Sequence, residues 1–374
     1  NKTKAFNKMD SKLRFALLCV LMLAMHTVYC APPNVIRFRA PNMFPHGFEW
    51  HKNKNVFLLG SLTTGQVYTV NDNAEVTQFT TDSRLNQRSA QGLELDYKRS
   101  ELLIALGNSS AANLGEMEYA KNAFARADIS TGQIKAFISL DEVKLESYKG
   151  TMLAGDMAVD PEGNVYVVET RGGFIWKIDT DNNATVYVSR PYWVPEAQFI
   201  PGIKGLVYSD NCDCLLVSKQ GEGHLYKVTL GPNPNVTEVM FPTGMPDNFS
   251  GLTIRSNGNL IVVGRPPVND VHPHIYEVVT SDSWETASIK YDVNATLTEP
   301  ITAIERDSDV FVLHAYLNDY LTGRETFDIT KAPAPISETY AEPSLSHEID
   351  DSGASSVGVC LITMLVALVI QMCL

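Results

Sequence analysis

The chain has 374 residues, of which 44% are hydrophobic and 20% charged, and its formal net charge is −13 with an isoelectric point near 5.1. A chain of this length buries enough apolar surface to fold without disulfide support. The acidic balance, with no basic stripe in the sequence, excludes nucleic acid as a partner, because phosphate binding needs clustered Lys and Arg.

The first 30 residues have the layout of a secretory signal peptide. Basic residues precede an unbroken apolar run over 15–24, and the run is followed by Cys30 and a Pro-containing segment. The basic residues are Lys2, Lys4, Lys8, Lys12 and Arg14. This order of a basic, an apolar and a short polar region predicts cleavage after Cys30 and export of the remaining chain.

The central part of the chain repeats one short phrase six times. Each copy has a small residue, then a polar residue flanked by apolar ones, then a turn and an apolar strand. The copies are Gly47–Trp50, Gly92–Asp96, Asp156–Asp160, Gly205–Tyr208, Gly251–Ile254 and, in degenerate form, Thr302–Glu305. A period of roughly 45 to 50 residues with strand-like alternation is typical of a β-propeller. We therefore predict an all-β, six-bladed β-propeller over residues 34–330.

The sixth repeat lacks a strand of its own. The run 310–313 is strand-like but has a poor partner hairpin, whereas 35–38 near the N-terminus alternates as a strand. We expect the N-terminal strand to pair into the last blade and close the ring, which removes exposed sheet edges. The second repeat is enlarged, with extra residues over 108–123 that are a candidate binding loop or structural filler.

Cysteines and glycosylation motifs agree with export. Only Cys212 and Cys214 lie between the leader and the C-terminal tail, and in an oxidising compartment they are predicted to form a small disulfide ring; two free thiols are the alternative. Five N-x-[ST] motifs predict N-glycans at Asn108, Asn183, Asn235, Asn248 and Asn294.

The C-terminal part changes composition twice. Residues 331–352 are rich in Pro, Ser and Glu and lack apolar periodicity, which predicts a flexible stalk. Residues 353–374 begin with small residues and continue as an apolar stretch without a following Lys or Arg. This pattern favours a glycolipid-anchor signal, and a retained transmembrane helix is the alternative. Both place the protein at the extracellular face of the cell membrane.

The phrases 44–50, 157–167 and 205–208 resemble the gluconolactonase and senescence-marker-protein family of six-bladed propellers, which is similar to strictosidine synthase and paraoxonase domains. The likeness covers most of 41–317. In that family a divalent cation at the channel mouth polarises a lactone or ester carbonyl and activates water, held by a Glu, an Asn and an Asp just before the repeated phrase.

The corresponding positions in this chain hold other residues. His46 stands at the Glu position, Gly155 followed by Asp156 at the substrate-side Asn, Lys204 at the later Asn and Ser250 at the Asp. The resemblance therefore predicts that a calcium-type lactonase site has been lost, because Lys204 adds a positive charge where a cation would bind. Calcium or another divalent cation stays a minor alternative.

Three functions follow as hypotheses. The first is a secreted, glycosylated, membrane-tethered binding or extracellular matrix module, with an unidentified ligand at the channel mouth and the second-repeat insert. The second is an extracellular hydrolase with a remodelled site, in which His46, Asp156, Lys204 and Ser250 act as a Ser nucleophile with its base and orienting groups. The third is an acidic extracellular or mineral-associated matrix component, suggested by the net charge and export.

Overall fold

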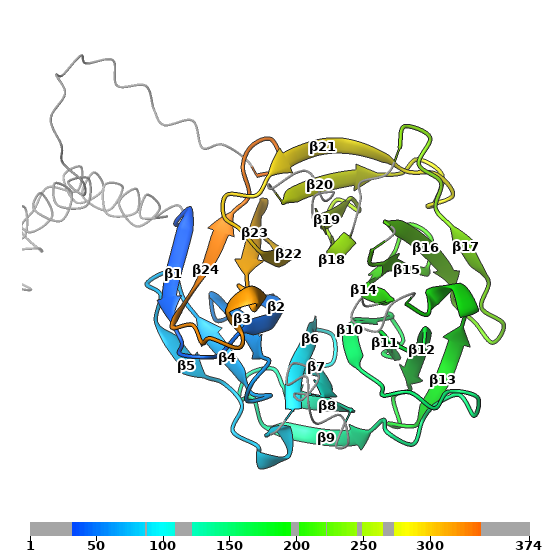
Figure 1. The fold of residues 1–374 in the computed structure, drawn as a ribbon, viewed down its shortest axis with the longest axis horizontal. Coiled ribbons are helices and arrows are strands. Elements are labelled where there is room, and N and C mark those ends of the chain that lie inside the picture. The colour runs from blue at the N-terminus through cyan, green and yellow to red at the C-terminus, as the bar shows by residue number, and fades with distance from the viewer. Residues whose placement is uncertain are drawn as a thin grey trace, which may run out of the picture. The chain divides into compact units, whose positions relative to one another are not determined.

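The computed structural model describes residues 32–86, 88–108, 122–195, 202–221, 223–244, 249–264 and 273–337. Within them, 24 strands form six four-stranded antiparallel sheets arranged as a ring (Figure 1). The prediction of an all-β, six-bladed propeller is confirmed. Among the described residues, no helix is long and apolar enough to cross a membrane.

Each blade runs from an innermost strand at the axis to an outermost strand at the rim. From the axis outward, blade one consists of β2 (Pro45–His51), β3 (Val56–Ser61), β4 (Val67–Val70) and β5 (Val76–Gln78), and blade two of β6 (Arg88–Asp96), β7 (Glu101–Asn108), β8 (Ala123–Asp128) and β9 (Ile134–Ser139). Blade three consists of β10 (Ala154–Val159), β11 (Val165–Glu169), β12 (Phe174–Ile178) and β13 (Ala184–Ser189), and blade four of β14 (Ile203–Ser209), β15 (Cys214–Lys219), β16 (His224–Thr229) and β17 (Val236–Glu238). Blade five consists of β18 (Phe249–Ile254), β19 (Leu260–Gly264), β20 (His274–Val279) and β21 (Ser288–Asn294), and blade six of β22 (Pro300–Arg306), β23 (Asp309–His314), β24 (Thr326–Lys331) and β1 (Val35–Arg39). Short 3-10 helices cover Ser83–Leu85 (η1), Pro191–Trp193 (η4) and Leu317–Asp319 (η5).

The repeated phrase forms the innermost strand of every blade. The turn that follows it is well explained in blade three, where the Asp160 carboxylate accepts hydrogen bonds from the backbone N–H groups of Gly163 and Asn164, both at 2.8 Å. Gly163 has φ +97°, a conformation that only glycine adopts without strain. The apolar strand that follows this turn is the second strand of its blade and is buried, as in β3.

The N-terminal strand closes the ring. β1 pairs with β24 over five residue pairs, and its alternate residues Ile36 and Phe38 are buried in the core shared by blades six and one. In that core the rings of Phe57 and Phe311 lie 5.2 Å apart and join the first blade to the last. The predicted closure by the N-terminal segment is confirmed, because β1 supplies the fourth strand of blade six beside β24 of the sixth repeat.

The propeller extends slightly beyond the predicted boundary at residue 330. Ala332, Ile336 and Ser337 are buried, and the Ser337 hydroxyl accepts a hydrogen bond of 2.9 Å from the backbone N–H of Val310. The start of the predicted stalk therefore packs on blade six, because two apolar side chains there find a place in its core. The predicted leader and C-terminal tail lie outside the described residues.

Three of the five predicted glycosylation sites lie exposed at the rim. Asn183 and Asn235 precede the outermost strands β13 and β17, and Asn294 ends β21. Asn108 ends β7, and its side chain is outside the description, as is all of Asn248. A disulfide joins Cys212 to Cys214, with 5.2 Å between their Cα atoms, in the turn between β14 and β15.

Candidate functional site

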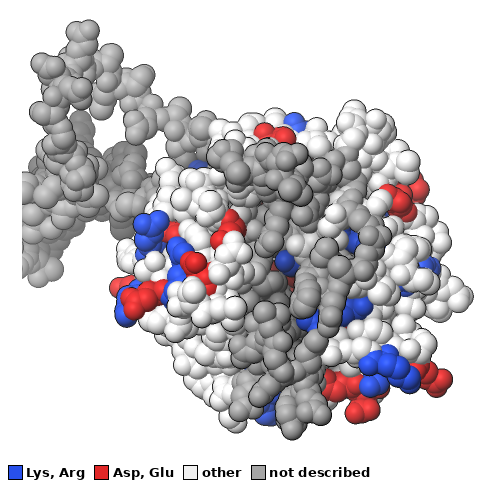
Figure 2. Space-filling view, in the orientation of Figure 1, with Lys and Arg blue, Asp and Glu red and all other residues white. Residues whose placement is uncertain are grey.

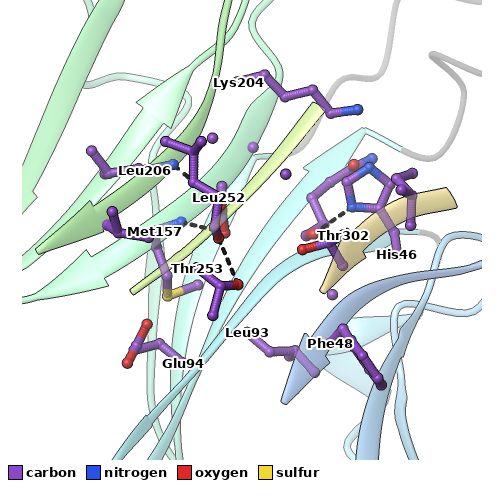
Figure 3. Close-up of a pocket in the computed structure, with 18 of the residues that line it drawn as sticks. His46, Phe48, Leu93, Glu94, Met157, Lys204, Leu206, Leu252, Thr253 and Thr302 are labelled. Carbon is purple, nitrogen blue, oxygen red and sulfur yellow. Dashed lines mark hydrogen bonds between the residues drawn. The ribbon is translucent and has the colours of Figure 1, made fainter. Parts of the chain in front are cut away.

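The innermost strands enclose a cavity of about 510 Å³ around the propeller axis (Figure 3). Its middle is apolar, because the same position of the repeated phrase holds a large hydrophobic side chain in five blades. These residues are Phe48, Leu93, Met157, Leu206 and Leu252, each paired with the second strand just after a register shift. Such a lining with a few polar groups is typical of small-molecule sites.

The glycines of the repeated phrase mark the closest approach of neighbouring inner strands. A Cβ on Gly47 would lie 2.7 Å from Leu93 Cγ, and one on Gly92 would lie 2.8 Å from the carbonyl oxygen of Gly155. At these glycines the neighbouring inner strand lies too close to leave room for a side chain. Asp156 and Thr302 occupy the corresponding position in blades three and six, so their side chains line the cavity where the other blades have none.

A β-bulge in each inner strand sets the mouth of the cavity. The antiparallel register shifts between Pro45 and Phe48, and at the matching place in the other five blades. The residues carried by these bulges are His46, Gln91, Gly155, Lys204, Ser250 and Ile301. Since a bulge re-aims the side chain it carries, the fold presents one residue of each blade to the mouth.

Hydrogen bonds connect the bulges of neighbouring blades. The His46 ring donates from Nδ1 to the carbonyl oxygen of Gln91 at 2.6 Å, which fixes the proton of the neutral ring on that nitrogen. Between blades four and five, Lys204 Nζ donates to Ser250 Oγ at 3.2 Å. The Ser250 side chain is fully buried. His46 and Lys204 lie towards one end of the cavity in Figure 3.

Asp156 links blade three to blade four. Its carboxylate accepts hydrogen bonds from the backbone N–H of Met157 at 3.0 Å and from that of Leu206 at 3.2 Å. Burial raises the pKa of Asp156 to about 7, although both backbone donors and the nearby Lys204 charge act in the opposite direction. Asp156 therefore changes protonation near neutral pH.

Two further carboxyl groups line the other end of the cavity and were missed from the sequence. Burial raises the pKa of Glu94 to about 8, and the pKa of Glu49 is also well above its usual range because of burial and the charge of Glu94. No described residue makes a hydrogen bond or ion pair with the Glu94 carboxyl group. Both residues are the polar member of the repeated phrase, so the signal was present but was interpreted as strand alternation.

Thr170 and Arg171 also line the cavity, and no sequence signal pointed to them. They follow β11, and the backbone N–H of Thr170 donates to the carbonyl oxygen of Leu153. Thr170 is 3% exposed, and its hydroxyl makes no hydrogen bond within the described part of the chain. The four residues expected from the sequence, His46, Asp156, Lys204 and Ser250, do line this same cavity.

The donor set at the mouth does not fit a divalent cation. Such ions bind several carboxylate, carbonyl or amide oxygens. The Lys204 ammonium lies 3.2 Å from Ser250 Oγ, so its positive charge would repel a cation that bound this oxygen. Among the described residues, no three His, Cys, Asp or Glu side chains gather as a metal site requires.

Solved structures share this fold at low sequence identity. The major allergen Mala s 1 of Malassezia sympodialis superposes with a TM-score of 0.67 at 15% identity, covering 84% of this chain and 100% of that one. A luciferin-regenerating enzyme gives 0.52 at 12% identity, covering 81% and 99%. Regucalcin of Agrobacterium tumefaciens, a calcium-binding protein, gives 0.50 at 12%, covering 78% and 92%.

No family model and no curated protein sequence matches the chain. At these identities the structural likeness shows the fold alone. The predicted resemblance to propellers of this kind is therefore confirmed for the architecture.

Proposed function

We propose that this protein is a binding module that receives a small molecule in the central cavity of its propeller. The observation that carries the proposal is the cavity itself, about 510 Å³, with an apolar middle and polar side chains at both ends. Apolar surface in such a cavity gains free energy when a ligand covers it, while the polar groups orient that ligand.

The setting of this module is the second part of the proposal. We place it at the extracellular face of the cell membrane, glycosylated and tethered through its C-terminal tail, with a soluble or matrix-bound extracellular ligand. The leader, the tail and the glycosylation motifs of the sequence support this location. The three exposed motifs lie at the outer rim, so glycans on Asn183, Asn235 and Asn294 would leave the central cavity open.

A soaking or thermal-shift screen of small molecules tests the binding function. We use Val207→Trp, which enlarges a partly exposed cavity-lining residue, and Met240→Trp, which enlarges a residue 61% exposed at the rim, as a matched control. Hits should raise the melting temperature of the wild type and the control, and lose at least tenfold in affinity in Val207→Trp. Hits that bind all three proteins equally would refute the cavity as the site.

One contact favours a second candidate function, an ester hydrolase without a metal. Lys204 Nζ lies 3.2 Å from Ser250 Oγ, and a Ser with a Lys base is a known catalytic arrangement. Ser250 Oγ would attack the carbonyl carbon while a neutral Lys204 took the hydroxyl proton, and the ester C–O bond would break as Lys204 returned that proton to the leaving alcohol. Water would then attack the acyl-Ser250 ester, releasing the carboxylic acid and restoring the Ser250 hydroxyl. Against this, Ser250 is fully buried and accepts the hydrogen bond from lysine.

A hydrolysis screen with aryl esters and lactones separates the two functions. The binding function predicts turnover no faster in the wild type than in Ser250→Ala. Turnover that is lost in Ser250→Ala and in Lys204→Met, but kept in the exposed-lysine control Lys144→Met, would establish the hydrolase instead.

A further inference from the structure

We infer that the ligand of the central cavity is an amphipathic carboxylate, with its anionic group at the mouth beside Lys204 and Thr170 and its apolar part among the large hydrophobic side chains below. This inference rests on the proposed binding function and adds the chemical class of the ligand.

The mouth of the cavity is rich in hydrogen-bond donors. Lys204 and Arg171 both line it, and the hydroxyl group of Ser250 holds the Lys204 ammonium in place. His46 also lines the cavity, but its Nδ1–H is already donated to the carbonyl oxygen of Gln91. Figure 2 shows Lys and Arg atoms near the centre of this face. An anion is stabilised where charged and neutral donors converge around a partly buried space.

Thr170 gives an independent indication of a polar ligand group. Its side chain is almost fully buried, it lines the cavity, and its Oγ1 has no hydrogen-bond partner among the residues that the structure describes. An unpaired buried hydroxyl costs free energy, and a ligand oxygen would remove that cost. Gly155 leaves space beside the Thr170 side chain, since a Cβ at position 155 would lie 2.7 Å from Thr170 Cγ2.

The acidic groups of the cavity do not displace an anion from the mouth. The Asp156 carboxylate is already bonded by two backbone N–H groups and lies near the Lys204 charge. Glu49 and Glu94 come three residues after the bulge residues of their strands, beyond the apolar ring. At about 3.3 Å per strand residue this places the apolar part of a ligand between the anionic group and these carboxyls.

A group with a single negative charge matches this mouth better than a dianion. The two basic residues Lys204 and Arg171 balance Asp156 and one anionic group, whereas a phosphate would add a second negative charge beside Asp156. Three strand residues separate the bulge from the glutamates, a span of about 10 Å that an extended chain of about eight carbon atoms matches in length. Octanoate is therefore the first probe.

The experiment compares four probes with the same apolar chain by isothermal titration calorimetry at pH 7: octanoate, octan-1-ol, octylamine and octyl phosphate. We expect octanoate to bind at least tenfold more tightly than octan-1-ol. Lys204→Met should abolish this difference, Lys204→Arg should keep most of it, and Thr170→Val should weaken octanoate threefold to tenfold. Lys144→Met, at an exposed lysine away from the cavity, should change nothing.

The outcomes separate this inference from the proposed function. Equal binding of octanoate and octan-1-ol, both lost in Val207→Trp, would overturn the carboxylate and leave the binding cavity standing. Tightest binding of octylamine would assign the ligand to Glu49 and Glu94 instead and overturn the inference. Tightest binding of octyl phosphate would overturn the choice of a single-charge head group. No binding by any probe, together with a negative small-molecule screen, would refute both proposals.

Discussion

Replacing Glu94 by Gln should make the propeller more stable, and the gain should grow as the pH rises. Glu94 lines the cavity, and burial, helped by the charges of Asp156 and Asp96, raises its pKa to about 8. In the unfolded chain a glutamate titrates near its usual value of about 4.3. Between these two values the folded protein holds a proton on Glu94 that the unfolded chain has released, so raising the pH favours unfolding.

The magnitude follows from proton linkage. In that window each pH unit changes the free energy of unfolding by about 1.4 kcal/mol for one group. Between pH 5 and pH 7 Glu94 thus costs the wild type up to about 2.5 kcal/mol. Gln cannot ionise, so the stability difference between Glu94→Gln and the wild type should increase by up to this amount over the same range.

Urea denaturation followed by tryptophan fluorescence at pH 5, 6 and 7 measures this difference. Glu146→Gln is the control, because Glu146 is exposed to solvent and does not line the cavity. Subtracting the wild-type curve removes the contributions of titrating groups that do not interact with Glu94. Glu49, whose pKa is raised by burial and by the Glu94 charge, shifts in the variant and changes the stability in the same direction. If the stability gain of Glu94→Gln stays constant with pH, or follows that of Glu146→Gln, the buried carboxyl group does not titrate as argued.

Three other perturbations have defined outcomes. Gly92→Ala should lose about 1–3 kcal/mol in urea denaturation, because its Cβ would press on the backbone of Gly155 at 2.8 Å; an unchanged stability would show that the inner strands can separate. Removing the residues before 40 exposes the edge of β24 and the packing sites of Ile36 and Phe38, which should cost about 3–6 kcal/mol and cause aggregation in light scattering, whereas a stable monomer would contradict ring closure by β1. In protein expressed through a secretory pathway, N-glycosidase treatment should lower the mass, and Gln at each of the three exposed rim asparagines should remove one step of that shift.

Much of the fold could be predicted because its signals are local. The period of the phrase, the alternation in each strand and the turn residues such as Gly163 all depend on neighbours in the sequence. Closure by 35–38 followed from counting strands, since a ring cannot leave one blade incomplete. The extension of the propeller to Ser337 was missed, because a short irregular segment shows no periodicity even where its side chains are buried.

The candidate site was only partly predictable. His46, Asp156, Lys204 and Ser250 were expected at the mouth because they precede or begin the repeated phrase, and they do line one cavity. Glu94 was overlooked, since a polar residue in an alternating strand is usually exposed to solvent. Glu94 in blade two interacts electrostatically with Glu49 in blade one, and the sequence of neither strand alone predicts this pairing.

The amino-acid sequence by itself determined the number of blades and the segment that completes the ring, since these depend on short-range patterning and on counting. The tertiary structure decided which polar residues meet. A bulge in each inner strand turns one side chain to the mouth, and the convergence of six strands on one axis brings residues from distant repeats together. Such meetings depend on the closed geometry of the whole ring, so no single repeat encodes them.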